Sequence, residues 1–115
     1  MGFNYSIDDE HAEKFISLLV LGALYAIKEK AMSIDEAEVF VFTPSTSRIL
    51  SEAGYSSALV DIIDYGCELE DVSDLIPERL TDNVKDLISQ TLSLISSRDY
   101  VAGTIDKKSA LSDMC

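Results

Sequence analysis

The chain has 115 residues, of which 9 are basic and 21 acidic, giving a formal net charge of −12 at pH 7. This length holds one hydrophobic core, and 47% hydrophobic residues with only five Gly and two Pro exclude intrinsic disorder and disfavour a many-stranded β-sandwich. Such a charge repels nucleic-acid phosphates and anionic lipids but attracts basic proteins, so we expect no direct contact with nucleic acid or membrane.

The first predicted helix covers residues 8–30, with acidic residues at its start and Lys28 and Lys30 at its end, as the helix dipole favours. Between them lies the sequence FISLLVLGALYAI, which is apolar on all faces and predicts a central helix buried by its neighbours. Gly22 within it predicts the close approach of another backbone. The stretch is too short to span a bilayer, and the acidic residues before it do not fit a signal peptide.

A second helix is predicted from Ser33, because Ser33 and Glu36 form the pattern of a capping box. Its end is ambiguous, since Val-Phe-Val-Phe at residues 39–42 has the composition of a strand while Ile34, Ala37 and Val41 keep a helical spacing. We favour the helix.

Capping residues then divide the middle of the chain into two further helices. Thr43 followed by Pro44 predicts a helix that ends at Gly54. Ser56 or Ser57 predicts the start of the next, which we expect to end at Gly66.

The remaining elements are a short helical turn at residues 70–75 and a long amphipathic helix from Leu80 to Ile95. Ile76 precedes Pro77 and should therefore be extended. Residues 100–115 have weak periodicity and form either a frayed tail or a loosely docked extension.

These elements predict an all-α fold, a single compact bundle of about five to six helices around a central apolar helix. The helical domain covers residues 1–99 and the tail residues 100–115. The helical periodicity predicts the core residues Leu18, Leu21, Leu24, Leu59, Ile62, Ile63, Leu87, Ile88 and Ile95.

The residues that usually carry chemistry are sparse. Cys67 and Cys115 form no disulfide framework and fit a reducing cytosol, so we expect a cytoplasmic protein. The single histidine, His11, lacks partners at ligand spacing, and no nucleophile, phosphate-binding or metalloprotease motif occurs. We therefore expect neither enzymatic activity nor a cofactor.

The densest feature is an acidic run at residues 61–82, where eight acidic residues face one basic residue, Arg79, for a net charge of −7. A calcium loop starting at Asp61 would place Gly66 correctly at position 6, but Ile63 and Val72 fall where oxygen ligands are required. We therefore expect no metal site. Paired catalytic carboxylates are a further alternative, yet nothing singles out a pair.

The acidic run is either a solvated helix edge or a surface for a basic partner. Tyrosines beside charges are typical interface anchors, which favours the second interpretation. The candidate binding residues are Tyr55, Asp61, Asp64, Tyr65, Glu68, Glu70, Asp71, Asp74 and Glu78.

Two stretches of the chain resemble known proteins, EKFISLLVLGALYAIKEKAMSIDEAEVFVFTPST and ALVDIIDYGCELEDVSDLIPERL. They resemble a family of short acidic bacterial proteins of unassigned activity, whose members include immunity proteins for contact-dependent growth inhibition. The resemblance covers roughly residues 13–94 and does not extend to the tail.

The resemblance implies a cytosolic antidote that neutralises the toxin domain of a cell-surface effector, often a nuclease with a basic active-site cleft. The charge of the chain agrees in sign with such a partner. An acidic helical regulatory module that binds a basic protein is the alternative, and a metal-assisted hydrolase using the same carboxylates ranks behind both.

Overall fold

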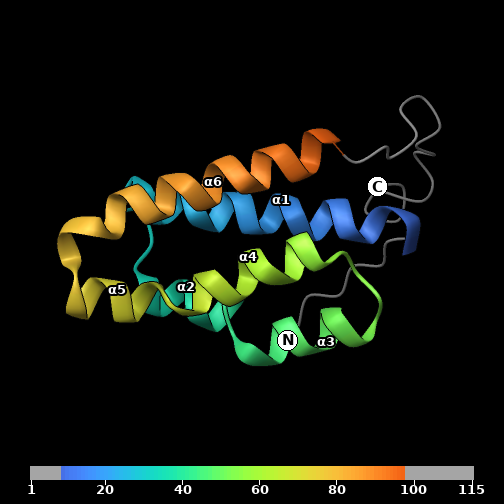
Figure 1. The fold of residues 1–115 in the computed structure, drawn as a ribbon, viewed down its shortest axis with the longest axis horizontal. Coiled ribbons are helices and arrows are strands. Elements are labelled where there is room, and N and C mark those ends of the chain that lie inside the picture. The colour runs from blue at the N-terminus through green and yellow to red at the C-terminus, as the bar shows by residue number, and fades with distance from the viewer. Residues whose placement is uncertain (1–8, 98–115) are drawn as a thin grey trace, which may run out of the picture.

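The computed structural model describes residues 9–97, and this part of the chain is helical without β-strands (Figure 1). Its elements are α1 (Asp9–Lys28), α2 (Ile34–Phe40), α3 (Pro44–Glu52), α4 (Ser57–Cys67), α5 (Leu69–Leu75), the 3₁₀ helix η1 (Pro77–Arg79) and α6 (Leu80–Ser97). The prediction of an all-α fold is therefore confirmed. The tail predicted at residues 100–115 lies outside the described residues.

The bundle has four helices rather than the five to six predicted, because two of the six α-helices are short. Helices α1, α3, α4 and α6 have 20, 9, 11 and 18 residues, whereas α2 and α5 have seven residues each. Helix α1 packs mainly against α6, α3 packs against α4, and α4 also packs against α6. The four longer helices thus form the body of the bundle, and α2 and α5 contact each other at one end of it.

The predicted helix starts are confirmed by side-chain caps. The Ser33 hydroxyl accepts the Glu36 backbone N–H while Glu36 reaches back to the Ser33 N–H, which completes the capping box. Thr43 accepts the N–H of Thr46, and Ser56 accepts the N–H of Leu59. The sequence favoured a helix over a strand at residues 39–42. Helix α2 includes Val39 and Phe40 but ends there, so the prediction is right for the first half of this segment, while Val41 and Phe42 follow the helix.

Two helix ends also agree with the sequence prediction. Gly54 adopts a φ of +86° just after α3, a conformation that glycine takes without steric cost. Ile76 has left the helical region, with a φ of −140° and a ψ of 62°, because Pro77 follows it.

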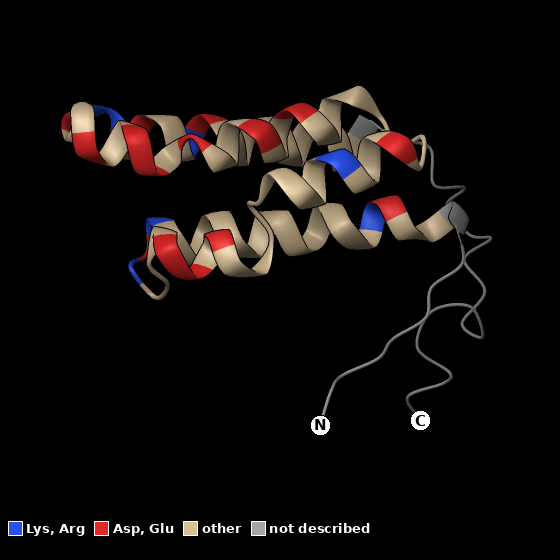
Figure 2. Ribbon diagram, turned by 90° about the horizontal axis from the view of Figure 1, so that it is seen from below, with Lys and Arg blue, Asp and Glu red and all other residues tan. Residues whose placement is uncertain are grey.

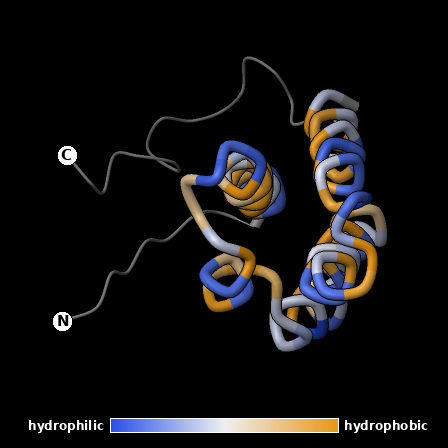
Figure 3. Tube along the Cα trace, turned by 90° about the vertical axis from the view of Figure 1, so that its left-hand side faces the viewer, coloured by the Kyte–Doolittle hydropathy of each residue, from blue (hydrophilic) through white to orange (hydrophobic). Residues whose placement is uncertain are grey.

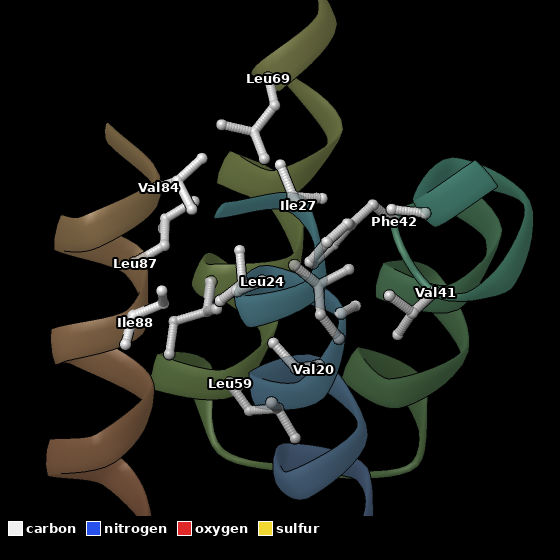
Figure 4. Packing of buried hydrophobic residues seen from close by; sticks show 14 of the residues in the cluster. Val20, Leu24, Ile27, Val41, Phe42, Leu59, Leu69, Val84, Leu87 and Ile88 are labelled. Carbon is white, nitrogen blue, oxygen red and sulfur yellow. The ribbon is translucent and has the colours of Figure 1, made fainter. Parts of the chain in front are cut away.

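The core lies between α1, α4 and α6, with α2, α3 and α5 in the lower half of the view in Figure 1, and Figure 4 shows its buried side chains from close by. Helix α1 contributes Val20, Leu24 and Ile27, which face Val84, Leu87 and Ile88 of α6 in Figure 4. Viewed along the long axis in Figure 3, each helix carries both hydrophobic and hydrophilic residues, as amphipathic packing requires. Most of the predicted core is confirmed, since Leu24, Leu59, Ile62, Ile63, Leu87 and Ile88 are buried.

The prediction that α1 is central and buried on all sides is wrong. Leu18 and Leu19 are 50% and 52% exposed, and Tyr25 is 42% exposed. Because α1 lies beside α6 at the edge of the bundle, only the face that carries Val20 and Leu24 is covered. Leu21 and Ile95, also predicted as core, are only partly buried. None of the described helices combines the length and apolarity that crossing a membrane requires.

The close approach of another backbone predicted at Gly22 is wrong, and the glycine that permits a close contact is Gly66, against a side chain. A Cβ on Gly22 would meet nothing within 4 Å. A Cβ on Gly66 would lie 2.7 Å from Cγ of the buried Phe42 ring and closer still to two other ring atoms. Gly66 therefore does not end α4, which continues to Cys67, but lets the Phe42 ring pack directly on the helix backbone.

A buried carboxylate ties α1 to the start of α4. Glu13 is 7% exposed, and its Oε1 accepts the backbone N–H of Ser56 at 2.6 Å. Ser56 in turn caps α4, so one α1 side chain fixes the residue from which α4 begins.

Candidate protein-binding face

The acidic run predicted at residues 61–82 lies on α4, α5, η1 and the first turn of α6. Asp61, Asp64 and Glu68 follow a helical spacing along α4 and its C-cap, and all three are exposed. Glu68 also begins α5, which presents Glu70, Asp71 and Asp74. We call the exposed side chains of Asp61, Asp64, Glu68, Glu70, Asp71, Asp74 and Glu78 the acidic face.

The acidic face has almost no internal counter-charge. Arg79 is the only basic residue between Asp61 and Asp82, and none of these acids forms a salt bridge within residues 9–97. Figure 2 shows red acidic positions recurring along the helices, with few blue basic positions among them. The negative charge is therefore available to a partner.

The two candidate tyrosines differ in their environment. Tyr65 is 53% exposed on α4 between Asp64 and Glu68, as an interface anchor would be. Tyr55 lies in the connection between α3 and α4, partly buried against the hydrophobic core. Tyr55 therefore has a packing role, whereas Tyr65 belongs to the surface.

A groove of about 900 Å³ lies between α4–α5 and α6, and we call it the α4–α6 groove. Ile62, Leu69, Leu87 and Leu94 form its apolar floor. Its other lining residues are Ala58, Asp61, Tyr65, Glu68, Val72, Asn83, Asp86, Ser89, Gln90 and Ser93. Of the acidic face, only Asp61 and Glu68 reach this groove, so the sequence candidates divide into a groove set and an outer set.

Two residues of the outer set, Glu70 and Asp71, lie close to the α2 carboxylates Asp35 and Glu38. Burial raises the pKa of Glu38, and so do a hydrogen bond with the Glu70 carboxyl group and the charges of Glu70, Asp35 and Asp71. The Glu38 carboxyl group therefore keeps its proton to a higher pH than an isolated glutamate does. This contact joins the two short helices.

The same group contains the one set of carboxylates among the described residues whose geometry could hold a metal ion. Ligand oxygens of Asp35, Glu38 and Glu70 lie within 4.8 Å of one another. A hard cation such as Ca²⁺ takes about six to eight oxygen ligands, and here it would also compete with the proton that Glu38 retains. Residues 61–72, whose sequence does not fit a calcium loop, lie mostly in the helices α4 and α5.

Cys67 is half-buried at the end of α4. Burial raises the pKa of its thiol, and the charges of Asp64, Glu38 and Glu68 raise it further. A thiol held protonated in this way is a poor nucleophile.

Asp35, Glu38 and Asp86 were not among the sequence candidates. The first two lie about thirty residues before their α5 neighbours in the sequence, and no local pattern predicts that pairing. Asp86 belongs to the polar side of an amphipathic helix, which the sequence assigns to solvent, but that side forms one wall of the groove.

Comparison with known sequences gives a match to one family model, described as "Protein of unknown function (DUF3969)", over residues 8–109. No curated protein and no solved structure matches the chain. The family description names no activity, so the function has to be argued from the surface.

Proposed function

The chain belongs to the DUF3969 family of proteins of unknown function, and from its surface we propose that it is a binding protein that neutralises a basic partner. Specifically, we propose an immunity protein that acts in the cytosol against a contact-dependent inhibition toxin domain, with a nuclease as the favoured class of toxin. The immunity role is supported by the sequence resemblance described above, and the proposed mechanism is supported by the acidic face.

The observation that carries the proposal is the accessibility of the acidic face. Seven acidic residues project from α4, α5 and η1, all exposed and without salt bridges in the described part of the chain. Acids that merely stabilise a fold would be expected to pair with nearby bases or to cap helix N-termini. Glu13 and Glu36 accept backbone N–H groups at helix starts, but they lie outside the acidic face. Within the acidic face, Glu70, Asp71 and Glu78 lie in the first turns of α5 and η1, where the helix dipole favours acids, but no side chain caps either helix.

A nuclease toxin presents Lys and Arg where it holds phosphate, and the acidic face can occupy such a cleft in place of the nucleic acid. Long-range attraction would speed the encounter, because a net charge of −12 acts on a basic partner before contact. Tyr65, exposed among these acids, would supply the apolar anchor. The antidote needs no chemistry of its own.

The alternative is an acidic regulatory module that binds a basic protein such as a transcription factor. The same surface supports it, so the genomic neighbour distinguishes the two. An adjacent reading frame that ends in a toxin domain favours the antidote, whereas an adjacent regulator favours the module.

The direct experiment is co-expression of the chain with the toxin domain of the adjacent effector. We expect growth to be rescued and the two proteins to elute as one complex in gel filtration. Toxicity that persists at equal expression, with separate elution of the two proteins, would refute the antidote function.

A further inference from the structure

We propose that the α4–α6 groove binds one amphipathic basic helix of the partner, with apolar side chains on the groove floor and Lys or Arg side chains against its acidic rims. This inference deepens the proposed function, since it rests on the existence of a basic protein partner and names the partner element that is recognised.

The first argument is charge complementarity. Both rims carry acids, Asp61 and Glu68 from the α4–α5 side and Asp86 from α6, while no Lys or Arg lines the groove. An anionic occupant would meet like charge from both sides, whereas a basic one would find partners on both. Aromatic Tyr65 stands at the rim, where it can cover an apolar side chain or the stem of a lysine.

The second argument concerns backbone hydrogen bonds. The groove walls are helices, whose backbone groups are satisfied within each helix, and no strand edge exists in the described chain to pair with an extended peptide. An occupant that enters this groove must satisfy its own backbone groups, and an α-helix does so. An extended segment would leave them facing an apolar floor.

The third argument is the shape of the lining. On α6, the groove residues Asn83, Asp86, Leu87, Gln90 and Leu94 recur at helical spacing, which covers about three turns. Ala58, Asp61, Ile62 and Tyr65 form the matching stripe on α4. Two such stripes with a floor between them receive the apolar side of a third helix at the i, i+3, i+4 and i+7 positions.

The test uses a synthetic amphipathic peptide of about four helical turns, with Leu at i, i+3, i+4 and i+7 and with Lys and Ala elsewhere. Its control is a scrambled peptide of the same composition and charge without the apolar stripe. Binding is followed by chemical-shift changes in ¹⁵N-labelled full-length protein. We expect the patterned peptide to perturb the groove residues of α4 and α6 and to bind at least about tenfold more tightly than the scrambled one.

Two pairs of variants locate the site. Ser93→Trp places a bulky ring in the groove, while Ser51→Trp changes an exposed α3 serine outside it. The double reversal Asp61→Lys, Asp86→Lys is compared with Glu29→Lys, Glu52→Lys, which changes the net charge equally outside the groove. We expect each groove variant to weaken binding at least about tenfold and each control to change it less than about threefold, with far-UV circular dichroism and thermal unfolding confirming that all four fold.

Equal binding of the two peptides, or perturbations centred on another face, would overturn the inference. Failure of the inference and failure of the proposed function can be told apart. If the peptide does not bind but the chain still rescues growth from the toxin, only the groove assignment is wrong. If the peptide binds at the groove but the toxin domain is not captured, the groove assignment holds and the antidote function fails.

Discussion

At the scale of single residues, the contact between Gly66 and the Phe42 ring leaves no room for a side chain at position 66. Phe42 is 2% exposed, so its ring cannot move away from a new methyl group without disturbing the core. We expect Gly66→Ala to lower the free energy of unfolding by about 1–3 kcal/mol through overpacking. Urea unfolding followed by circular dichroism measures the change.

Gly22 provides the matched control within a helix. It is exposed, and a Cβ there would meet nothing. Gly22→Ala should therefore raise stability by about 0.5–1 kcal/mol, the usual gain from removing glycine from a helix interior. If Gly66→Ala raised stability as Gly22→Ala is expected to, the packing described for Phe42 would be wrong.

Glu38 determines a pH dependence whose sign can be worked out. Its pKa in the folded protein is raised above the ordinary value of 4.5, so the folded state binds the proton more tightly than the unfolded chain. The resulting stabilisation is fully present below pH 4.5 and is lost as the pH rises through the folded pKa. Above that pH, the charges of Glu38, Glu70, Asp35 and Asp71 repel one another.

We expect Glu38→Gln to have a higher melting temperature than the wild type near pH 7, because the amide cannot ionise and can donate a hydrogen bond to Glu70. This difference in melting temperature should shrink as the pH is lowered toward 4.5, where Glu38 of the wild type is protonated. Calorimetry at several pH values measures the difference between variant and wild type. Glu52→Gln, at the end of α3, is the control. A melting temperature for Glu38→Gln below that of wild type at pH 7 would contradict the assigned repulsion.

At the scale of the elements, helix starts were predictable because caps are local. Ser33, Thr43 and Ser56 each hold a backbone N–H three residues ahead, and the sequence pattern alone indicates such bonds. The buried face of α1 was not predictable, since residues 15–27 are apolar all round and give no periodicity to orient the helix. The link from Glu13 to Ser56 spans 43 residues and depends on the packing of α1 near α4.

The observed orientation of α1 predicts that two of its leucines contribute very differently to stability. Leu24 is fully buried, so Leu24→Ala should cost about 2–5 kcal/mol by leaving a cavity. Leu18 is 50% exposed, so Leu18→Ala should change stability by less than about 0.5 kcal/mol. Equilibrium unfolding in denaturant compares the two, and a larger loss for Leu18 would reverse the orientation of the helix.

The candidate site was predictable only in part, because part of it depends on how helices distant in the sequence pack together. The acidic run is contiguous in the sequence, and its exposure follows from the amphipathic pattern of α4. The groove requires two helix faces that are about twenty-five residues apart in the chain, and the Glu38–Glu70 contact requires α2 to pack on α5. Such pairings are set by tertiary packing rather than by local pattern.

At the scale of the whole molecule, a net charge of −12 should oppose folding through self-repulsion. Raising NaCl from about 0.01 M to 0.15 M shortens the screening length from about 30 Å to 8 Å. We therefore expect the melting temperature to rise with salt over this range, measured by calorimetry at pH 7. A fall would mean that attractive pairs outweigh the repulsion.

Salt should have the opposite effect on recognition of the partner. Steering by the acidic face acts at long range, so added NaCl should slow association with the toxin domain far more than it speeds dissociation. Stopped-flow or surface-based kinetics separates the two rates. An association rate that does not change with salt would contradict the prediction that the negative charge steers the partner toward the acidic face.

The central claim, that the acidic face binds the toxin, is tested most directly by the triple reversal Glu70→Lys, Asp71→Lys, Asp74→Lys. These residues are exposed, and lysines at positions 70 and 71 would lie near Glu38 and Asp35, so we expect the fold to be retained. A control of equal net charge carries Glu29→Lys, Glu52→Lys, Ser51→Lys and Ser96→Lys, all at exposed positions outside the acidic face.

The measurement is the affinity of each variant for the cognate toxin domain by titration calorimetry, together with growth rescue. Each charge pair lost from an interface costs about 2–5 kcal/mol, so the triple reversal should weaken binding by several orders of magnitude and abolish rescue. The control should bind and protect nearly as well as the wild type. If instead the triple reversal binds and protects like wild type while the control fails, the acidic face is a solvated helix edge and the toxin binds elsewhere.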